Sequence, residues 1–139
     1  MDAQLRDVMS TPPAVVEVSA PIVDAARAMR DLDIGDVLVV DGEQLFGILT
    51  DRDITVRAVA QGTPLEAVTA GDVCSTGVLT LSADQTVEDA VRLMSDNALR
   101  RVPITEDQRL VGIVSLGDLA VEREPDSVLS EISSAPANG

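Results

Sequence analysis

The feature that most constrains this chain is an internal repeat. Residues 8–54 align with residues 73–119 without a gap, at an offset of 65 positions (73 − 8). Most apolar positions exchange only with apolar ones, and identical pairs run along the alignment, among them Ser10/Ser75, Asp24/Asp89, Met29/Met94, Gly47/Gly112, Ile48/Ile113 and Asp53/Asp118. Such self-similarity indicates a duplicated structural unit, so we expect two similar copies of one fold element.

Each copy predicts the element order β-α-β-β-α. The predicted strands are 14–18, 37–40 and 45–49 in the first copy, and 78–81, 102–105 and 110–114 in the second. The last two strands of each copy flank a short polar segment, which is typical of a β-hairpin. Closing helices are predicted at about 51–61 and 116–123.

The helix after the first strand of each copy has one apolar face. Thr86 followed by Asp89 predicts a capping box at the second of these helices, and Pro21 stands at the matching point of the first. The apolar residues at helical spacing are Ile22, Ala25, Ala26, Met29 and Leu32, and then Val87, Ala90, Val91, Met94 and Ala98.

Neither copy has enough apolar surface to bury both faces of a three-stranded sheet alone. We therefore expect the copies to pack about a pseudo-twofold axis into one α+β module. The predicted domains are a first motif at 5–61, a linker at 62–72, a second motif at 73–123 and a partly disordered C-terminal tail at 124–139.

Charge and composition argue against several partners. The chain of 139 residues carries 10 basic residues, all arginine, and 24 acidic ones, for a net charge of −14. Nucleic acids and anionic membranes bind through lysine and arginine, so neither is an expected partner. No apolar stretch is long enough for a membrane helix, and we expect a cytoplasmic protein.

The usual equipment of an enzyme is absent from the sequence. There is no histidine, and a single cysteine, Cys74, excludes an internal disulfide or a thiolate zinc site. No glycine-rich dinucleotide or Walker loop occurs. We expect a non-enzymatic protein without a metal or a required cofactor. Cys74 aligns with Met9, which favours a buried or dimer-interface thiol over an intermolecular disulfide.

The ends of the two closing strands carry a family resemblance. Residues 47–54 and 112–119 share a glycine, then threonine or serine, then aspartate three residues later. These segments resemble the signature of cystathionine beta-synthase (CBS) motifs, and 100–104 is similar to the usual start of the middle strand. The resemblance covers about residues 5–122. It implies a Bateman module, pairing into disc-shaped homodimers, and binding of an adenine nucleotide or S-adenosylmethionine, although some members bind no ligand.

The same residues suggest a ligand site on chemical grounds. Thr50 and Ser115 end a strand and open a helix, where backbone N–H groups favour a phosphate. Asp53 and Asp118 follow by one helical turn, and a carboxylate there suits the hydroxyls of a ribose. The alternative is that these four residues only cap the closing helices.

The copies differ around these positions. Arg52 gives the first copy a cation where the second has Leu116-Gly117, whereas Arg100 and Arg101 give the second copy cations where the first has Gly35 and Asp36. Asp36 would repel a phosphate, so we expect one working site between the two copies. The alternative for Arg100 and Arg101 is a solvated pair or a surface salt bridge.

An adenine ring needs an apolar slot, which the resemblance places between the first and middle strands of a copy. Plain core packing is the alternative for each residue, and no aromatic side chain lies nearby for stacking. The candidates are Val15, Val16 and Val37 in the first copy, and Val78, Leu79, Val102 and Pro103 in the second.

Two functions follow. The first is a regulatory homodimer that binds AMP, ADP, ATP or S-adenosylmethionine and signals to a separate, unknown protein. The second is a ligand-free homodimeric interaction scaffold. The repeated hydroxyl and carboxylate pair favours the first function, whereas Asp36, Leu38 and Leu116-Gly117 depart from the pattern and favour the second.

Overall fold

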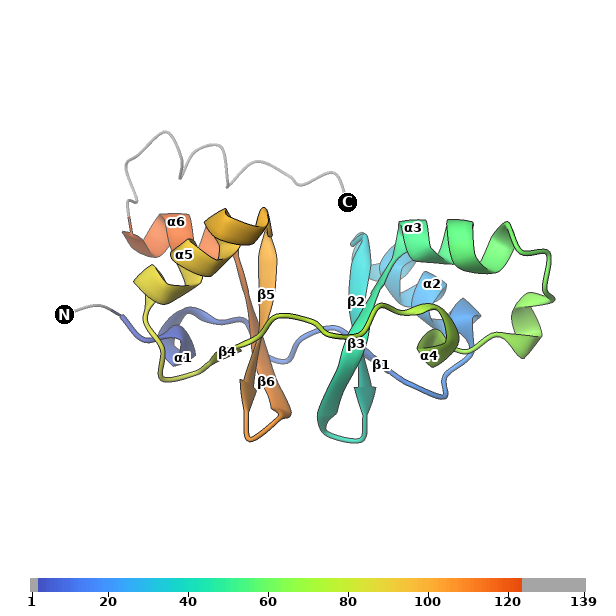
Figure 1. The fold of residues 1–139 in the computed structure, drawn as a ribbon, viewed down its shortest axis with the longest axis horizontal. Coiled ribbons are helices and arrows are strands. Elements are labelled where there is room, and N and C mark those ends of the chain that lie inside the picture. The colour runs from blue at the N-terminus through green and yellow to red at the C-terminus, as the bar shows by residue number, and fades with distance from the viewer. Residues whose placement is uncertain (1–2, 124–139) are drawn as a thin grey trace. The chain divides into compact units, whose positions relative to one another are not determined.

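The repeated pattern of strands and helices gives the same run of elements twice (Figure 1). The computed structural model describes residues 3–123, and the predicted tail at 124–139 lies outside the described residues. The elements of the first half are α1 (Leu5–Val8), β1 (Val15–Glu17), α2 (Ile22–Leu32), β2 (Asp36–Asp41), β3 (Gln44–Thr50), α3 (Asp51–Asp53) and the π-helix η1 (Ile54–Val59). Those of the second half are the 3-10 helix η2 (Leu65–Ala67), α4 (Ala70–Val73), β4 (Leu81–Ser82), α5 (Val87–Asn97), β5 (Arg101–Glu106), β6 (Arg109–Ser115) and α6 (Leu116–Arg123).

The strands confirm the α+β class and the order β-α-β-β-α. In each half the first strand is parallel to the middle strand, which forms an antiparallel hairpin with the last. Both hairpins close through two residues, and the second turn has Asp107 and Gln108 at φ 53° and 69°, the left-handed region that such tight turns require. The predicted strand at 78–81 is wrong in extent, because β4 begins only at Leu81.

Two compact units make up the described residues. Residues 14–78 form one, called unit N here, and residues 3–13 with 79–123 form the other, called unit C. Each unit has its own core beneath its helices. The core of unit N includes Ile22, Ala25, Met29, Val37, Val39 and Leu49, and that of unit C includes Leu5, Val87, Ala90, Met94, Val102, Ile104 and Val114. The predicted apolar face of α2 is too wide, since Ala26 and Leu32 are exposed.

The units differ from the sequence motifs 5–61 and 73–123 in their first segments. Residues 3–13 precede the first motif's strands but pack in unit C, where Leu5 is completely buried. Residues 65–78 precede the second motif's strands but pack in unit N, where Val73 and Cys74 join the core. The physical reason is that each short segment buries its apolar residues and completes its hydrogen bonds on the other motif.

The exchanged segments pair with the last strand of their host unit. Ser10 and Ile113 exchange two backbone hydrogen bonds of 2.8 and 3.2 Å, and Ser75 and Ile48 exchange two of 2.9 Å. The two pairs have equivalent positions in the repeat, because 10 + 65 = 75 and 48 + 65 = 113. The duplication therefore extends to the way each segment crosses to the other motif.

The closing helices are the main departure from the repeat. The second copy has a regular helix, α6, whereas the first continues from the single turn α3 into a π-helix over Ile54–Val59. The predicted helix at 51–61 is thus helical but not uniformly α-helical. A π-helix is rare and changes which side chains share a face, so the two copies present different surfaces after the same strand. Among residues 3–123, no helix is long and apolar enough to cross a membrane.

Candidate functional site

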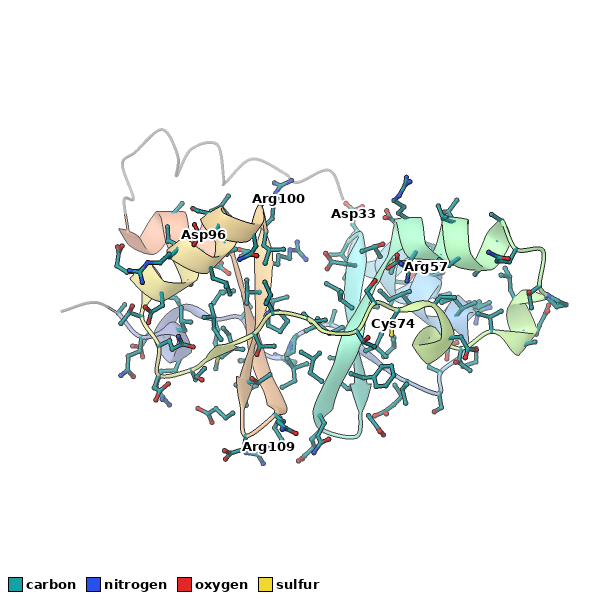
Figure 2. All side chains as sticks on the ribbon, viewed as in Figure 1. Asp33, Arg57, Cys74, Asp96, Arg100 and Arg109 are labelled. Carbon is teal, nitrogen blue, oxygen red and sulfur yellow. The ribbon has the colours of Figure 1, made fainter. Side chains whose placement is uncertain are left out.

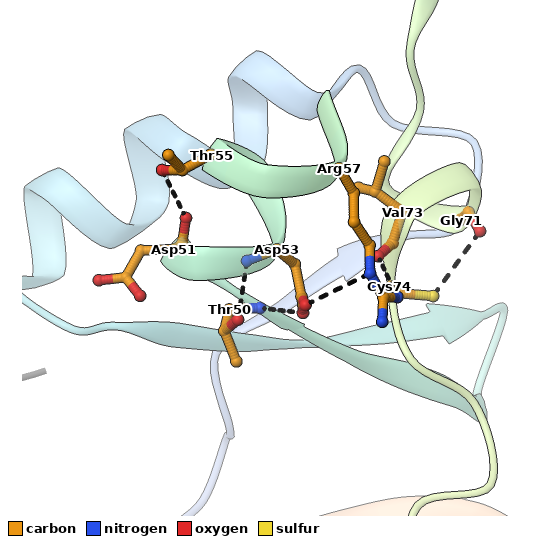
Figure 3. Close-up of polar contacts among 8 residues, drawn as sticks. All are labelled: Thr50, Asp51, Asp53, Thr55, Arg57, Gly71, Val73 and Cys74. Atoms are coloured by element: carbon orange, nitrogen blue, oxygen red, sulfur yellow. Dashed lines mark hydrogen bonds and ion pairs between the residues drawn. The ribbon is translucent and has the colours of Figure 1, made fainter. Parts of the chain in front are cut away.

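The hydroxyl and carboxylate of the first copy meet at the junction of β3 and α3. The backbone N–H of Asp53 donates to Thr50 Oγ1 at 3.0 Å, and the backbone N–H of Thr50 donates to Asp53 Oδ2 at 2.9 Å (Figure 3). These reciprocal bonds form a capping box and end the strand where the helix begins. Thr50 and Asp53 therefore do cap the closing helix, and this capping engages one of the two carboxylate oxygens.

The second copy repeats this geometry between β6 and α6. The backbone N–H of Asp118 donates to Ser115 Oγ at 3.2 Å, and the backbone N–H of Ser115 donates to Asp118 Oδ2 at 3.1 Å. All four residues are half-buried. Each copy thus fixes one hydroxyl and one carboxylate at the first turn of its closing helix.

The remaining carboxylate oxygens have different neighbours. Asp53 Oδ1 lies 3.9 Å from Arg57 Nε, an ion pair between residues one helical turn apart. Asp118 Oδ1 has no hydrogen bond or ion pair with any side chain that the structure describes. Toward the described side chains, the carboxylate of the second copy therefore keeps one oxygen as an acceptor, whereas that of the first already faces a cation.

Sheet register places the charged residues beside these junctions. Arg101 is paired with Ser115 across the β5–β6 hairpin, and the backbone N–H of Leu116 donates to the carbonyl of Arg100 at 2.8 Å. Arg100 is exposed near the start of β5 (Figure 2). The backbone positions of both arginines thus lie at the Ser115 end of the sheet.

In the first copy the same register brings a carboxylate instead. Asp36 pairs with Thr50 across the β2–β3 hairpin. Arg52 is exposed on α3, and together with Asp51 of α3 and with Thr55 and Val56 of η1 it lines a shallow and open depression. A phosphate at this junction would face Asp36 on one side, which is the electrostatic difference anticipated between the copies.

The candidates for an adenine slot separate into core and surface. Val37 and Val102 are 1% and 0% exposed and lie in the cores of their units, so for them the core alternative applies. Pro103 is also buried, Val16 and Val78 are half-buried, and Val15 and Leu79 are each 44% exposed. Val15 lies on β1 beside β2, whereas Val78 and Leu79 precede β4.

Cys74 is buried in unit N. Its Sγ lies 3.8 Å from the carbonyl oxygen of Gly71, and burial raises the pKa of the thiol above its ordinary value. The carboxylate of Asp53 raises this pKa further and the guanidinium of Arg57 lowers it. Sequence reasoning anticipated the burial of Cys74 but missed Arg57, whose spacing of four residues from Asp53 is the signal that would have found it.

The comparisons with known proteins agree on one family. The family model described as "CBS domain" matches residues 5–59 and 70–123. CBS domain-containing protein YhcV of Bacillus subtilis is 39% identical over 125 residues, with 87% of this chain and 86% of the relative covered. Hypoxic response protein 1 of Mycobacterium tuberculosis is 34% identical over 116 residues, with 83% and 81% covered.

Solved structures give the same result. The crystal structure of Hypoxic Response Protein I with two coordinated zinc ions has a TM-score of 0.76 at 33% identity, covering 85% of this chain and 97% of that one. The CBS domain pair of protein MJ0100, in complex with 5-methylthioadenosine and S-adenosyl-L-methionine, has a TM-score of 0.71 at 29% identity, covering 86% and 94%. In this chain, residues 3–123 contain no group of three or more histidine, cysteine or acidic residues placed to hold a metal ion.

Proposed function

The chain belongs to the CBS-domain family, and from that premise we propose that it is a non-enzymatic, cytoplasmic regulatory protein. It binds an adenosine-containing ligand, namely AMP, ADP, ATP or S-adenosylmethionine, and signals to a separate protein. The ligand has different affinities for two conformational states of the protein, so its binding shifts the population between them. The partner protein also binds these two states with different affinities.

One observation carries this proposal: at the Ser115 junction, Asp118 Oδ1 has no partner among the side chains that the structure describes. A carboxylate oxygen that no described side chain occupies suits the hydroxyls of a ribose. The N-terminus of α6 and the arginines at 100 and 101 provide positive charge for a phosphate or a carboxylate. The ligand-bound CBS pair of MJ0100, at 29% identity, supports the choice of ligand class.

Calorimetry tests the proposal directly. The protein is stripped of nucleotide and titrated with AMP, ADP, ATP and S-adenosylmethionine, because a chain without tryptophan or tyrosine has no useful intrinsic fluorescence. We expect saturable binding of at least one ligand, with one strong site per chain. No heat with any ligand at several temperatures would refute ligand sensing.

The second function is a ligand-free homodimeric scaffold, and the capping boxes favour it. They engage both hydroxyls and one oxygen of each carboxylate, while Val37 and Val102 are core residues. In either function we propose a homodimer. Val56 and Val59 support it, since they are 46% and 55% exposed on η1 and burial of both would favour association.

A further inference from the structure

Arg57 contacts two elements that are distant in sequence. Its Nε faces Asp53 Oδ1 at 3.9 Å, and its Nη1 donates to the carbonyl oxygen of Val73 at 3.3 Å (Figure 3). Asp53 belongs to the candidate site of the first copy, and Val73 ends α4 just before the exchanged segment pairs with β3. One guanidinium therefore ties the carboxylate of a candidate ligand site to the segment that completes unit N.

The second copy cannot form the same contact. Position 122 is equivalent to Arg57 in the repeat, because 57 + 65 = 122, and the sequence has glutamate there. A glutamate has no guanidinium with which to pair a carboxylate four residues earlier, so the residue type alone rules out a contact like that of Arg57. The two copies therefore carry opposite charges at this repeat position, arginine in the first and glutamate in the second.

We propose that Arg57 withholds Asp53 from ligand and uses it to hold the segment 73–75 on unit N, which leaves ligand binding to Asp118 in unit C. The proposal rests on the proposed function, because it gives a reason to expect one working site at two similar junctions. Arg57 is a positioning residue in this arrangement. The first copy uses its carboxylate for structure, and the second keeps its carboxylate for the ligand.

Cys74 provides a built-in probe of the held segment. It is the single cysteine of the chain and is only 9% exposed, next to Val73 and against Gly47. A modifying reagent reaches it when the segment 73–75 opens locally. Its titration also senses both members of the ion pair, since Asp53 and Arg57 shift the thiol pKa in opposite directions.

The first experiment needs no ligand and measures iodoacetamide alkylation of Cys74 as a function of pH. For Arg57→Ala we expect the plateau rate of alkylation to rise roughly twofold to fivefold, because one ion pair with a solvent-exposed arginine is lost. The midpoint of its pH dependence should move to higher pH, because a cation near the thiolate is removed. For Asp53→Asn the plateau rises too, but the midpoint moves to lower pH. Arg57→Lys keeps the positive charge, so we expect the midpoint pH of its alkylation to lie close to that of the wild type.

The matched control is Arg30→Ala. Arg30 is also an exposed arginine of unit N paired with an aspartate, at 2.8 Å from Asp31, but it is not in contact with Val73. We expect Cys74 of Arg30→Ala to be alkylated at the same rate as Cys74 of the wild type. Circular dichroism serves to check that each variant is folded. Equal plateau rates in Arg57→Ala and Arg30→Ala would overturn the proposal.

The second experiment measures binding of 5-methylthioadenosine, which has a ribose but no phosphate that Arg57 itself would attract. In an Asp118→Asn background, Arg57→Ala is expected to strengthen binding about twofold to fivefold, and adding Asp53→Asn abolishes that gain. If the wild type binds 5-methylthioadenosine but Arg57→Ala does not strengthen binding in the Asp118→Asn background, the proposal is overturned. If the wild type binds no adenosine ligand, the proposed function fails, while the alkylation rates still decide the role of Arg57 in holding the segment.

Discussion

A Cβ atom added to Gly47 would lie 2.5 Å from the backbone carbonyl oxygen of Ser75. The equivalent Gly112 would meet the side chain of Met9 first, with its Sδ at 2.5 Å, and the carbonyl oxygen of Ser10 at 3.1 Å. Both glycines therefore mark the place where an exchanged segment crosses the last strand. The obstacle is backbone in unit N and mainly a flexible side chain in unit C.

We expect Gly47→Ala to destabilise the protein by about 2–3 kcal/mol and Gly112→Ala by about 1 kcal/mol, since methionine yields more easily than backbone. Urea unfolding followed by circular dichroism measures both. Met9→Ala combined with Gly112→Ala is expected to recover part of the loss. Equal losses for the two glycines would contradict this account of the crossing.

Leu5 is expected to stabilise the second motif, although it precedes the first motif's strands in sequence. Its side chain is completely buried in the core of unit C, so Leu5→Ala should cost about 2–4 kcal/mol. Hydrogen exchange locates the effect: the amide of Val114 in unit C should lose more protection than that of Leu49 in unit N. The reverse pattern would contradict the exchange of segments.

Asp118 and Asp53 are expected to differ in ligand binding. Asp118→Ala should weaken binding of S-adenosylmethionine by about tenfold or more, because a hydrogen bond to a charged group is lost, whereas Asp53→Ala should weaken it much less. Calorimetry measures both. Asp89→Ala is the control, because it removes the carboxylate of a capping box in the same unit that caps a different helix, α5. Equal losses for Asp118→Ala and Asp53→Ala would refute a single working site.

Asp72 is expected to make stability depend on pH in the acid range. Hydrogen bonds from the backbone and the side chain of Thr69 lower the pKa of Asp72 below its ordinary value of 3.8. A carboxyl group whose pKa is lower in the folded state than in the unfolded state stabilises the fold at pH values above its unfolded-state pKa. This stabilisation is lost as the pH falls through the folded-state pKa. Asp72→Asn should therefore melt at lower temperature than the wild type near neutral pH, and the difference should vanish in strong acid.

Glu66→Gln is the control for Asp72, because Glu66 is an exposed carboxylate of η2 in the same unit. Its melting temperature should follow that of the wild type across the range. A difference between Asp72→Asn and wild type that persists unchanged in strong acid would contradict the assignment.

Val56 and Val59 are expected to lie in a homodimer interface. Replacing both with aspartate should give a monomer in light scattering coupled to size exclusion, because charge in an apolar contact is costly. Leu32→Asp is the matched control, since Leu32 is also apolar and 57% exposed in unit N but lies on α2. A dimer that survives the double substitution, or that Leu32→Asp breaks equally, would refute this interface.

Much of the fold could be predicted because it depends on local pattern. The offset of 65 positions predicted two copies, and the hairpins at Asp41–Gln44 and Glu106–Arg109 followed from polar residues between apolar strands. The capping box of Thr86 and Asp89 also followed from spacing and is present. Residue type and spacing determine these features without reference to distant parts of the chain.

The candidate site was predicted in its composition but not in its partners. Sequence reasoning named Ser115, Asp118 and the two arginines as candidates, and the hairpin register of the structure pairs Arg101 with Ser115. It did not predict that Arg57 pairs with Asp53, and it left open whether Val37 and Val102 lie in an adenine slot or in the core, where the structure has them. Those facts depend on side-chain direction and on what packs above a strand.

The sequence by itself determined that this protein is a duplicated α+β unit with CBS-type junctions, since repeat, periodicity and caps are local properties of the chain. Only the tertiary structure decided which motif each short segment completes. Leu5 and Val73 are apolar residues on short helices, and neither helix is stable alone. Each takes its place from the burial and backbone hydrogen bonds that the other motif offers, and such contacts between distant residues leave no periodic trace in the sequence.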